Sequence, residues 1–337
     1  MRVFMMILVV ASLLAISGKA QQLSSPGITF MFYNAENLFD IRDDELTRDE
    51  AFLPDGDRHW TYGRLLKKLN HTYKVIAGVG EWQPPAVIGL AEVENHYVLE
   101  TLLQETPLHR FGYEIIHQDS PDARGIDVAI LYRPDLFKVL QQEFIGVELP
   151  NERTTRDILY VAGMVGQVDT IHLYINHWPS RYSGTKVSDP SRMAAAETLK
   201  SHIKSILVKD PEAKVLVTGD FNDSPEDASI QMLQERTGLR NISSYKNEGT
   251  HKHQGEWGLL DQWLVTDSWF EKNKGCYIQD GVGKVYAEEW LLEEDVTHLG
   301  FKPSRTYVGF KYQGGFSDHL PVYLTIKLPP LLGDHSE

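Results

Sequence analysis

Acidic and amide side chains follow a strongly apolar segment in the sequence VLVTGDFNDSP, residues 215–225. Residues 215–218 are apolar or β-branched and predict a buried strand, which Gly219 lets the chain leave by a tight turn. Asp220 and Asn222 then fall on the following loop. A carboxylate and a carboxamide at a strand end can share one small volume, where the first accepts a proton or binds a cation and the second orients an oxygen. The segment alone fits equally well a turn that caps the next helix.

Further polar side chains follow or interrupt other apolar segments, and strand ends are where α/β proteins usually assemble their sites. These residues are Asn34, Glu36, Glu92, Asn176, His177, Asp261, Asp318 and His319. Carboxylate and amide oxygens bind hard cations such as Mg²⁺, while histidines and an aspartate can move protons and stabilise negative charge. These residue types favour a site that combines a bound cation with proton transfer.

Alternating apolar segments predict the elements that must position these residues. The pattern predicts strands at 28–33, 86–91, 113–117, 128–132, 157–165, 170–175, 215–218, 259–266, 306–312 and 322–328. It predicts helices at 65–77, 97–104, 191–208 and 226–235. Residues 40–58 are expected to form a solvated surface loop, and residues 270–303 carry no clear pattern. Hairpin-like neighbours argue against a purely parallel sheet and favour two packed mixed sheets flanked by helices.

The whole chain limits the possible functions. Arg2, an apolar run and small residues up to Ala20 predict a secretory signal peptide at 1–20. No later apolar segment is long enough to span a membrane. Residues 21–337 contain no linker, internal repeat or low-complexity tract, which favours a single domain. Cleavage would leave 31 basic against 47 acidic residues, a net charge of −16. Such a surface does not attract nucleic acid in general, but it is compatible with an enzyme that meets phosphate through bound cations. Cys276 is the only cysteine, so no intrachain disulfide can form.

Seven segments in order resemble the motif series of the endonuclease/exonuclease/phosphatase superfamily, which contains pancreatic-type DNases and exonuclease III-like repair nucleases. They are YNAENLF, LAEVEN, RGIDVAILY, NHWPSR, TGDFNDSP, LLDQWLV and FSDHLP, and they span about residues 30–324. Each motif is weak alone, whereas seven in the same order are specific. The NHWPSR and RGIDVAILY forms look most like secreted bacterial nuclease-like members.

The resemblance implies a DNase I-like α/β fold, a four-layer α/β/β/α sandwich with the site at one edge and Mg²⁺ or Mn²⁺ as cofactor. Glu92 would be the principal metal ligand, with Asn34 nearby and Asp318 as the other carboxylate on the metal side. Glu94, in the same LAEVEN segment, competes with Glu92 for that role.

The resemblance also implies roles in the hydrolysis of a phosphodiester. Asp220 would orient or deprotonate the attacking water, and Asn222 would hold a phosphate oxygen. His319, paired with Asp261, would lie against the scissile phosphate, and His177 would lie on the leaving-group side. Which histidine acts as the general acid stays open.

Arginines and aromatic residues near these motifs have two interpretations each. Arg124, Arg181 and Arg192 are candidate phosphate contacts, with Arg181 favoured because it lies four residues past His177, but on an acidic surface they fit ion pairs as well. Trp178 and Tyr182 could stack on a substrate or simply pack. The remaining histidines singled out as structural are His59, His71, His96, His117, His251 and His253.

The leading hypothesis is an exported endonuclease, a monomer without a stable protein partner, that cleaves DNA, with RNA left open. Its location would be the periplasm or the medium. A second hypothesis keeps the chemistry but acts on phospholipid or inositol-phosphate headgroups, and a third is a non-catalytic binding module. The apolar residues 290–292 discriminate between the first two, because an exposed patch favours a membrane-surface substrate and a buried one favours the nuclease.

Overall fold

The computed structural model describes residues 27–81, 83–150, 153–181, 184–244 and 249–329. The predicted signal peptide at 1–20 and Tyr182 lie outside these ranges. Among the helices of the described residues, none is long and apolar enough to cross a membrane.

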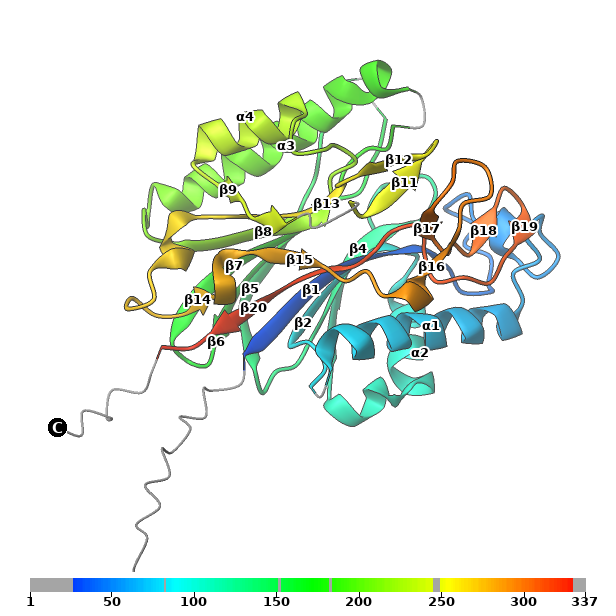
Figure 1. The fold of residues 1–337 in the computed structure, drawn as a ribbon, viewed down its shortest axis with the longest axis horizontal. Coiled ribbons are helices and arrows are strands. Elements are labelled where there is room, and N and C mark those ends of the chain that lie inside the picture. The colour runs from blue at the N-terminus through cyan, green and yellow to red at the C-terminus, as the bar shows by residue number, and fades with distance from the viewer. Residues whose placement is uncertain (1–26, 82, 151–152, 182–183, 245–248, 330–337) are drawn as a thin grey trace, which may run out of the picture.

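Two mixed β-sheets form the centre of the molecule (Figure 1). The first sheet contains, in spatial order, β10 (Ser243–Ser244), β15 (Gly283–Val285), β20 (Val322–Lys327), β1 (Ile28–Leu38), β2 (Val87–Val93), β4 (Asp127–Tyr132) and β3 (Glu114–His117), with β14 (Tyr277–Ile278) paired to β20. The second contains β5 (Phe137–Ile145), β6 (Ile158–Val165), β7 (Asp169–His177), β8 (Lys214–Asp220), β13 (Asp261–Val265) and β9 (Arg240–Asn241). In the first sheet β1 and β2 run parallel, and in the second β7 and β8 do.

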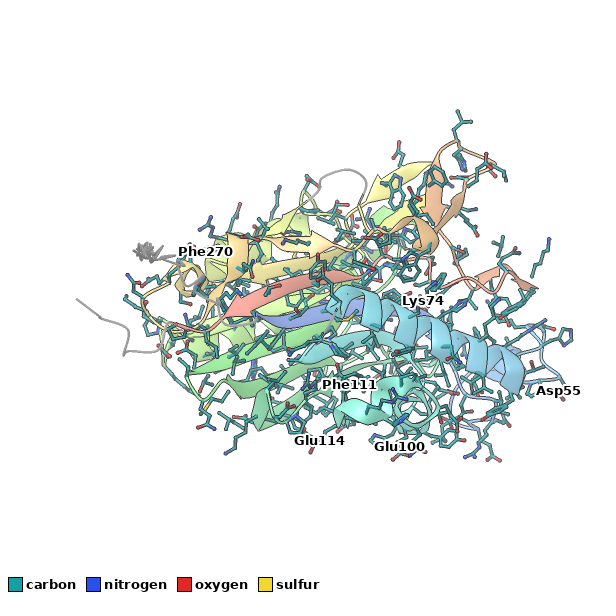
Figure 2. The ribbon with its side chains drawn as sticks, turned by 60° about the horizontal axis from the view of Figure 1, so that its bottom comes forward. Asp55, Lys74, Glu100, Phe111, Glu114 and Phe270 are labelled. Atoms are coloured by element: carbon teal, nitrogen blue, oxygen red, sulfur yellow. The ribbon has the colours of Figure 1, made fainter. Side chains whose placement is uncertain are left out.

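Helices cover the outer face of each sheet, which gives four layers. Helices α1 (Tyr62–Gly80) and α2 (His96–Glu105) lie against the first sheet, and α3 (Thr185–Leu207) and α4 (Ala228–Thr237) lie against the second (Figure 1). Figure 2 shows α1 crossing in front of the first sheet, with Lys74 on the helix, Asp55 in the loop at one end of the molecule and Phe270 at the other. The predicted four-layer α/β/β/α sandwich is confirmed.

Central strands are buried on both faces because each sheet has a core on either side. One apolar cluster fills the space between the sheets, a second lies between the first sheet and α1 and α2, and a third lies under α3 and α4. All seven residues of β8 are buried, and β2 is buried except at Glu92. Strands of this kind have near-continuous apolar sequences, which explains why they stand out in the sequence.

Several predicted elements differ from the structure. Strand β5 was missed, because most of its residues are at least partly exposed on a sheet edge. The predicted strand at 306–312 is wrong, since the chain there forms a short hairpin of β18 (Tyr307–Val308) and β19 (Lys311–Tyr312). The loop at 40–58 contains the short helix Glu50–Phe52 and two buried acids, Asp40 and Asp49, so it is not simply solvated.

Residues 270–303, which the sequence left unassigned, form short elements around the closing strand. They include the 3₁₀ turns Asp267–Phe270, Gln279–Gly281 and Glu289–Leu291, and the hairpin of β16 (Leu292–Glu294) with β17 (Phe301–Pro303). The hairpin of β11 (His251–His253) and β12 (Glu256–Gly258) lies beside the β16–β17 hairpin (Figure 1). Two- and three-residue strands are too short to produce a readable alternation of apolar and polar residues.

A substitution at Phe137 tests the packing of the core between the sheets. Its fully buried ring lies edge-on to Phe30, with 5.6 Å between ring centroids, and a Cβ on Gly163 would fall 2.1 Å from it. Phe137→Ala is expected to lower the free energy of unfolding by about 3–5 kcal/mol, because the cavity left behind cannot close fully. Urea denaturation measures this, with Leu140→Ala on the exposed face of the same strand as control. Equal losses in both variants would contradict this packing.

Candidate active site

Strand ends from both sheets meet at one end of the molecule. Parallel pairing of β7 with β8 sets His177 opposite Asp220, and antiparallel pairing of β13 with β8 sets Asp261 opposite the same residue. From the first sheet, Asn34 on β1 pairs with Ala91, the residue before Glu92 on β2. The register of five strands therefore brings the predicted residues together.

Asn34 connects the carboxylates of the two sheets. Its fully buried side-chain amide donates to Asp220 Oδ2 at 3.0 Å and lies 3.4 Å from Glu92 Oε1. The other Glu92 oxygen accepts the backbone N–H of Asn37 at 2.9 Å, and Asn34 Oδ1 accepts the backbone N–H of Glu36. These bonds fix the direction of both carboxylates.

The backbone is strained where these residues stand. Glu36, Asn37, Glu92 and Asn222 have φ values of 50°, 55°, 58° and 50°, in the left-handed region that side chains other than glycine rarely adopt. The β1–β2 register shifts just before Glu92, and so does the β2–β4 register. Such bulges re-aim side chains at functional sites, and here both registers shift at Glu92, the one residue of β2 that is not buried.

His319 is held by a buried carboxylate. Its Nδ1 lies 2.7 Å from Asp261 Oδ2, and its Nε2 lies 3.6 Å from Asp220 Oδ2. Burial alone would lower the pKa of His319, but the charges of Asp261 and Asp220 hold that pKa well above its usual range. Burial, with the nearby Asp261 charge, raises the pKa of Asp220 to about 7. His319 is therefore a cation at neutral pH, next to a carboxylate that can take up a proton there.

His177 differs from His319 in its charge state. Its Nε2 lies 3.7 Å from Asp220 Oδ2 and 3.9 Å from Glu92 Oε1. Burial, followed by the charges of Arg156 and Arg124, holds the pKa of His177 well below its usual range. Its buried Nδ1 has no hydrogen-bond partner among the described residues. His177 is thus a neutral imidazole at the same carboxylates that His319 faces as a cation.

Asp318 belongs to a neighbouring cluster that the sequence did not reveal. Arg305 donates to Asp318 Oδ2 at 2.7 Å and to Glu36 Oε1 at 3.3 Å. His251 Nε2 lies 4.0 Å from Asp318 Oδ2, and its ring centroid is 4.8 Å from that of His319. Burial and the charge of His319 lower the pKa of His251 to about 4. His251 was expected to be structural, and its short polar hairpin gave no motif that could have indicated otherwise.

Asn222 and Arg181 shape the loop after β8. Asn222 donates an amide hydrogen to the Trp178 carbonyl at 3.0 Å, and its second amide hydrogen has no acceptor among the described residues. Arg181 Nε donates to the Asn222 carbonyl, and its Nη2 pairs with Asp223 at 3.0 Å and with Asp227. Of the two interpretations given for Arg181, a phosphate contact or an ion pair, the structure shows the ion pair. Trp178 is buried and packs edge-on against Phe221, so it is not available for stacking on a substrate.

Two arginines share one carboxylate beside His177. Asp122 pairs with Arg156 at 2.9 Å and with Arg124 at 3.2 Å, so this group carries a net positive charge. The Arg124 side chain remains 48% exposed, whereas Arg156 is buried. Arg124 thus forms an ion pair, which was one of its two interpretations, and its exposed side chain stays accessible to an anion.

The residues present fit a divalent cation. Asp220 and Asp261 offer carboxylate oxygens that lie within 4.8 Å of each other, and His251 and Asp318 offer a ring nitrogen and a carboxylate oxygen that also do. His319 lies beside both pairs, but as a cation it has no lone pair to offer a metal. One oxygen of buried Asp261 has no hydrogen-bond partner among the described residues. Hard cations bind such oxygen-rich sites, and buried carboxylates need a partner of this kind.

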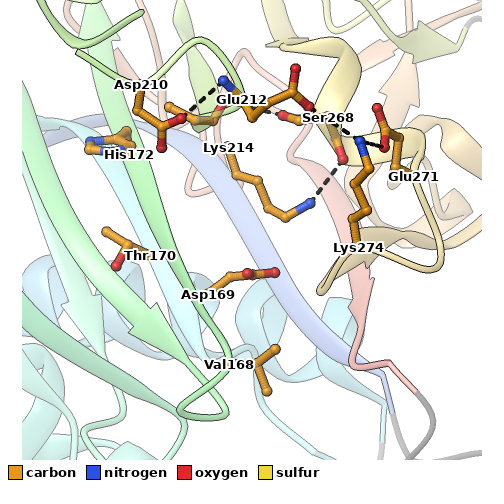
Figure 3. Close-up of a pocket in the computed structure, with 11 residues that line it drawn as sticks. Val168, Asp169, Thr170, His172, Asp210, Glu212, Lys214, Ser268, Glu271 and Lys274 are labelled. Carbon is orange, nitrogen blue, oxygen red and sulfur yellow. Dashed lines mark hydrogen bonds and ion pairs between the residues drawn. The ribbon is translucent and has the colours of Figure 1, made fainter.

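A pocket of about 390 Å³ at the opposite end of β7 and β8 does not resemble this site (Figure 3). Lys214 Nζ donates to the Ser268 carbonyl at 2.8 Å, and Asp169 accepts the backbone N–H of Cys276 at 2.5 Å. Its buried charged groups already have partners within the protein.

Comparisons with known proteins identify the family to which the chain belongs. The sequence profile of the endonuclease/exonuclease/phosphatase family matches residues 29–328, so the chain belongs to this family. Members of its superfamily are metal-dependent phosphoester hydrolases. A search of curated protein sequences finds no significant match.

Three solved structures illustrate the shared fold. A family member from Bacteroides thetaiotaomicron has a TM-score of 0.58 at 15% identity, over 91% of this chain and 99% of that chain. A mannosyl-6-phosphatase from the same species has a TM-score of 0.57 at 15% identity, over 89% and 99%. The human nocturnin catalytic domain has a TM-score of 0.54 at 14% identity, over 90% and 94%. These similarities establish the fold and leave the substrate and the secreted branch as predictions.

The pair of His319 with Asp261 gives a pH-dependent prediction. Asp261→Asn removes the charge that raises the pKa of His319, so the imidazole should lose its proton at a lower pH. If the cation is the active form, the alkaline limb of the kcat/KM profile should move to lower pH, with a rate loss on the order of 10²-fold above neutrality. A pH–rate profile of the folded variant measures this, and an unmoved alkaline limb would contradict the assignment.

Proposed function

We propose that this protein is a divalent-metal-dependent phosphodiesterase that cleaves nucleic acid, acting as an endonuclease on DNA. The observation that carries the proposal is the meeting of Asn34, Asp220 and His319, which come from both sheets and bond or face one another within 3.6 Å. Hydrolysis of a phosphodiester needs an oriented water, stabilisation of charge on the phosphoryl oxygens and help for the leaving alkoxide.

The chain's own residues can divide this work. Asp220, directed by the Asn34 amide, orients the attacking water and accepts its proton, for which a pKa of about 7 is suitable at neutral pH. His319, kept cationic by Asp261, stabilises the negative charge on the phosphoryl group. Neutral His177 faces the same oxygen of Asp220 at 3.7 Å, and we assign it to the leaving-group side.

Glu92 is proposed as the principal metal ligand, with Asn34 beside it and Asp318 as a further carboxylate. Mg²⁺ or Mn²⁺ bound there would supply Lewis-acid stabilisation of phosphate oxygens. Asn222 keeps a free amide hydrogen for a phosphate oxygen, and Arg124 is proposed to bind a flanking phosphate.

Packing of residues 290–292 favours a soluble substrate over a membrane surface. Leu291 is buried, Trp290 and Leu292 pack against the core under α1, and Lys74 Nζ lies 4.4 Å from the centroid of the Trp290 ring. No exposed patch remains at these residues. Since a buried patch at 290–292 was expected for a nuclease and an exposed one for an enzyme acting at a membrane surface, this packing supports the nuclease over the headgroup phosphodiesterase.

Export completes the proposal. The basic start, apolar run and small residues of 1–20 support cleavage after Ala20 and release of an acidic monomer to the periplasm or the medium. Because such a surface repels DNA, activity should depend steeply on divalent cations.

His319→Ala should reduce nicking of supercoiled plasmid by on the order of 10²-fold or more, because the transition state loses its fixed cation. The assay uses purified protein with Mg²⁺ or Mn²⁺ against EDTA. His253→Ala is the matched control, since this exposed histidine lies two residues from His251 on the β11–β12 hairpin.

The outcomes test the catalytic role of His319 and the identity of the substrate separately. Metal-dependent nicking that is lost in His319→Ala but kept in His253→Ala supports the endonuclease. If the folded wild type fails to nick DNA but hydrolyses phospholipid or inositol-phosphate headgroups, the substrate assignment is wrong while the site stands. Undiminished turnover of His319→Ala would refute the role of His319.

A further inference from the structure

A small surface beside the candidate active site carries positive charge, although the chain as a whole is acidic. The β18–β19 hairpin lies at the end of the molecule where β1 ends, next to the start of α1 (Figure 1). Four cations meet there: Arg58 in the loop before α1, Arg64 and Lys67 on α1, and Lys311 on β19. These four residues and Phe310, at the tip of the hairpin, are here called the hairpin surface.

Aromatic rings rather than carboxylates hold these cations in place. The Arg58 guanidinium lies 5.5 Å from the centroid of the Phe310 ring. The Arg64 guanidinium and Lys67 Nζ lie 4.3 Å and 5.8 Å from the centroid of the Tyr312 ring. Within the described part of the chain, none of the four cations forms an ion pair with Asp or Glu. A cation over an aromatic face keeps its full charge, so this surface can attract an anion.

The outer part of the hairpin surface is open to a ligand. Lys67 and Lys311 are exposed, and Phe310 is 61% exposed. Gly309 turns the chain in the left-handed conformation, and its carbonyl accepts a hydrogen bond from Arg58 Nη1 at 2.7 Å. An exposed ring held near exposed cations combines the two features that bind a nucleic-acid strand, since cations contact phosphates and an aromatic face stacks on a base.

Direct contacts connect the hairpin surface to the candidate active site. The Arg305 guanidinium donates to Asp318 Oδ2 at 2.7 Å, and its side chain remains 39% exposed. Two residues further along the chain, the Tyr307 hydroxyl donates to the Arg58 carbonyl at 2.9 Å. A strand whose phosphate lies at His319, the residue after Asp318, therefore passes Arg305 and meets the hairpin surface next.

We propose that the hairpin surface binds the single-stranded nucleic-acid segment that flanks the scissile phosphate, with phosphates at Lys67 and Lys311 and an unpaired base stacked on Phe310. The inference rests on the proposed function and names the kind of strand that the enzyme holds, because stacking needs a base whose face is not covered in a duplex. A lipid surface fits less well, since membrane-bound faces need a broad apolar area and the exposed apolar side chains of this hairpin, Val308 and Phe310, form a narrow tip.

Binding of a fluorescein-labelled single-stranded DNA oligonucleotide tests the proposal, by anisotropy over a range of salt concentrations. The full chain is used with Mg²⁺ in the His319→Ala background, which slows cleavage and leaves the hairpin surface intact. Lys67→Gln combined with Lys311→Gln should weaken binding on the order of 10-fold. The slope of log K against log salt should become shallower by about 1.4, since each phosphate contact contributes about 0.7 for a single strand.

The aromatic contact has its own signature in the same assay. Phe310→Ala should weaken binding roughly 5-fold or more and leave the salt slope unchanged, because stacking on a base releases no counterions. Lys138→Gln is the matched control, since this exposed lysine lies on β5, on the edge of the second sheet. It should change neither the affinity nor the slope.

Cleavage of the same oligonucleotide with His319 intact separates this proposal from the proposed function. Lys67→Gln combined with Lys311→Gln should raise KM on the order of 10-fold and keep kcat within about 2-fold, because flanking contacts are equal in the ground state and the transition state. Binding that depends on the hairpin surface without any cleavage would sink the proposed nuclease and support this surface.

Two results would overturn the proposal while the nuclease stands. One is oligonucleotide binding and KM that are unchanged in all the hairpin variants. The other is loss of binding to anionic phospholipid vesicles in the same variants with oligonucleotide binding retained, which would assign the surface to a membrane.

Discussion

A single buried amide joins the two halves of the candidate site. Asn34 sits in the first sheet, yet its side chain donates to Asp220 at the end of the second, while also lying 3.4 Å from Glu92. Apolar packing between the sheets sets their spacing, and a second polar link runs from His319, just before β20, to Asp261 on β13. The Asn34 bond converts that spacing into a defined distance between a proposed metal ligand and a proposed base.

Rigid strands and strained ends have separate roles in this arrangement. The buried strands β1, β2 and β8 fix where the chain emerges, because a shift of one residue would turn every apolar side chain to the wrong face. The left-handed residues Glu36, Asn37, Glu92 and Asn222 lie just beyond or within those ends. Core packing therefore stabilises a backbone that the local sequence would not choose, and this strain aims the polar groups.

The charge states of His319 and His177 differ, and the geometry of the site explains both. Asp261 contacts His319 directly, whereas His177 meets the charges of Arg156 and Arg124 in addition to its burial. Both rings face Asp220, at 3.6 Å and 3.7 Å. One oxygen of Asp220 thus faces a cationic and a neutral imidazole, which is the separation of acid and base functions that general acid–base hydrolysis requires.

How much the sequence could predict depended on burial. Strands such as β8 are covered on both faces, so their apolar runs and the polar residues after them were readable, and the four-layer sandwich followed from the ordered motifs. Strand β5 lies exposed at an edge and leaves no such pattern. His251 reaches the site from a short hairpin and Arg305 from the link between β17 and β18, where contacts depend on tertiary packing rather than on local periodicity. The burial of Asp40 and Asp49 was hidden for the same reason, because a charged loop has the same composition whether its acids face water or protein.

The most direct test of the central claim is anomalous diffraction from a crystal of the protein soaked in Mn²⁺, compared with the Glu92→Gln variant. The account predicts a manganese peak at bonding distance from a Glu92 oxygen, beside Asn34 and on the side that faces Asp220 and His319, and loss of that peak in the variant. A peak that persists in Glu92→Gln, or a well-ordered Glu92 with manganese bound elsewhere, would contradict it.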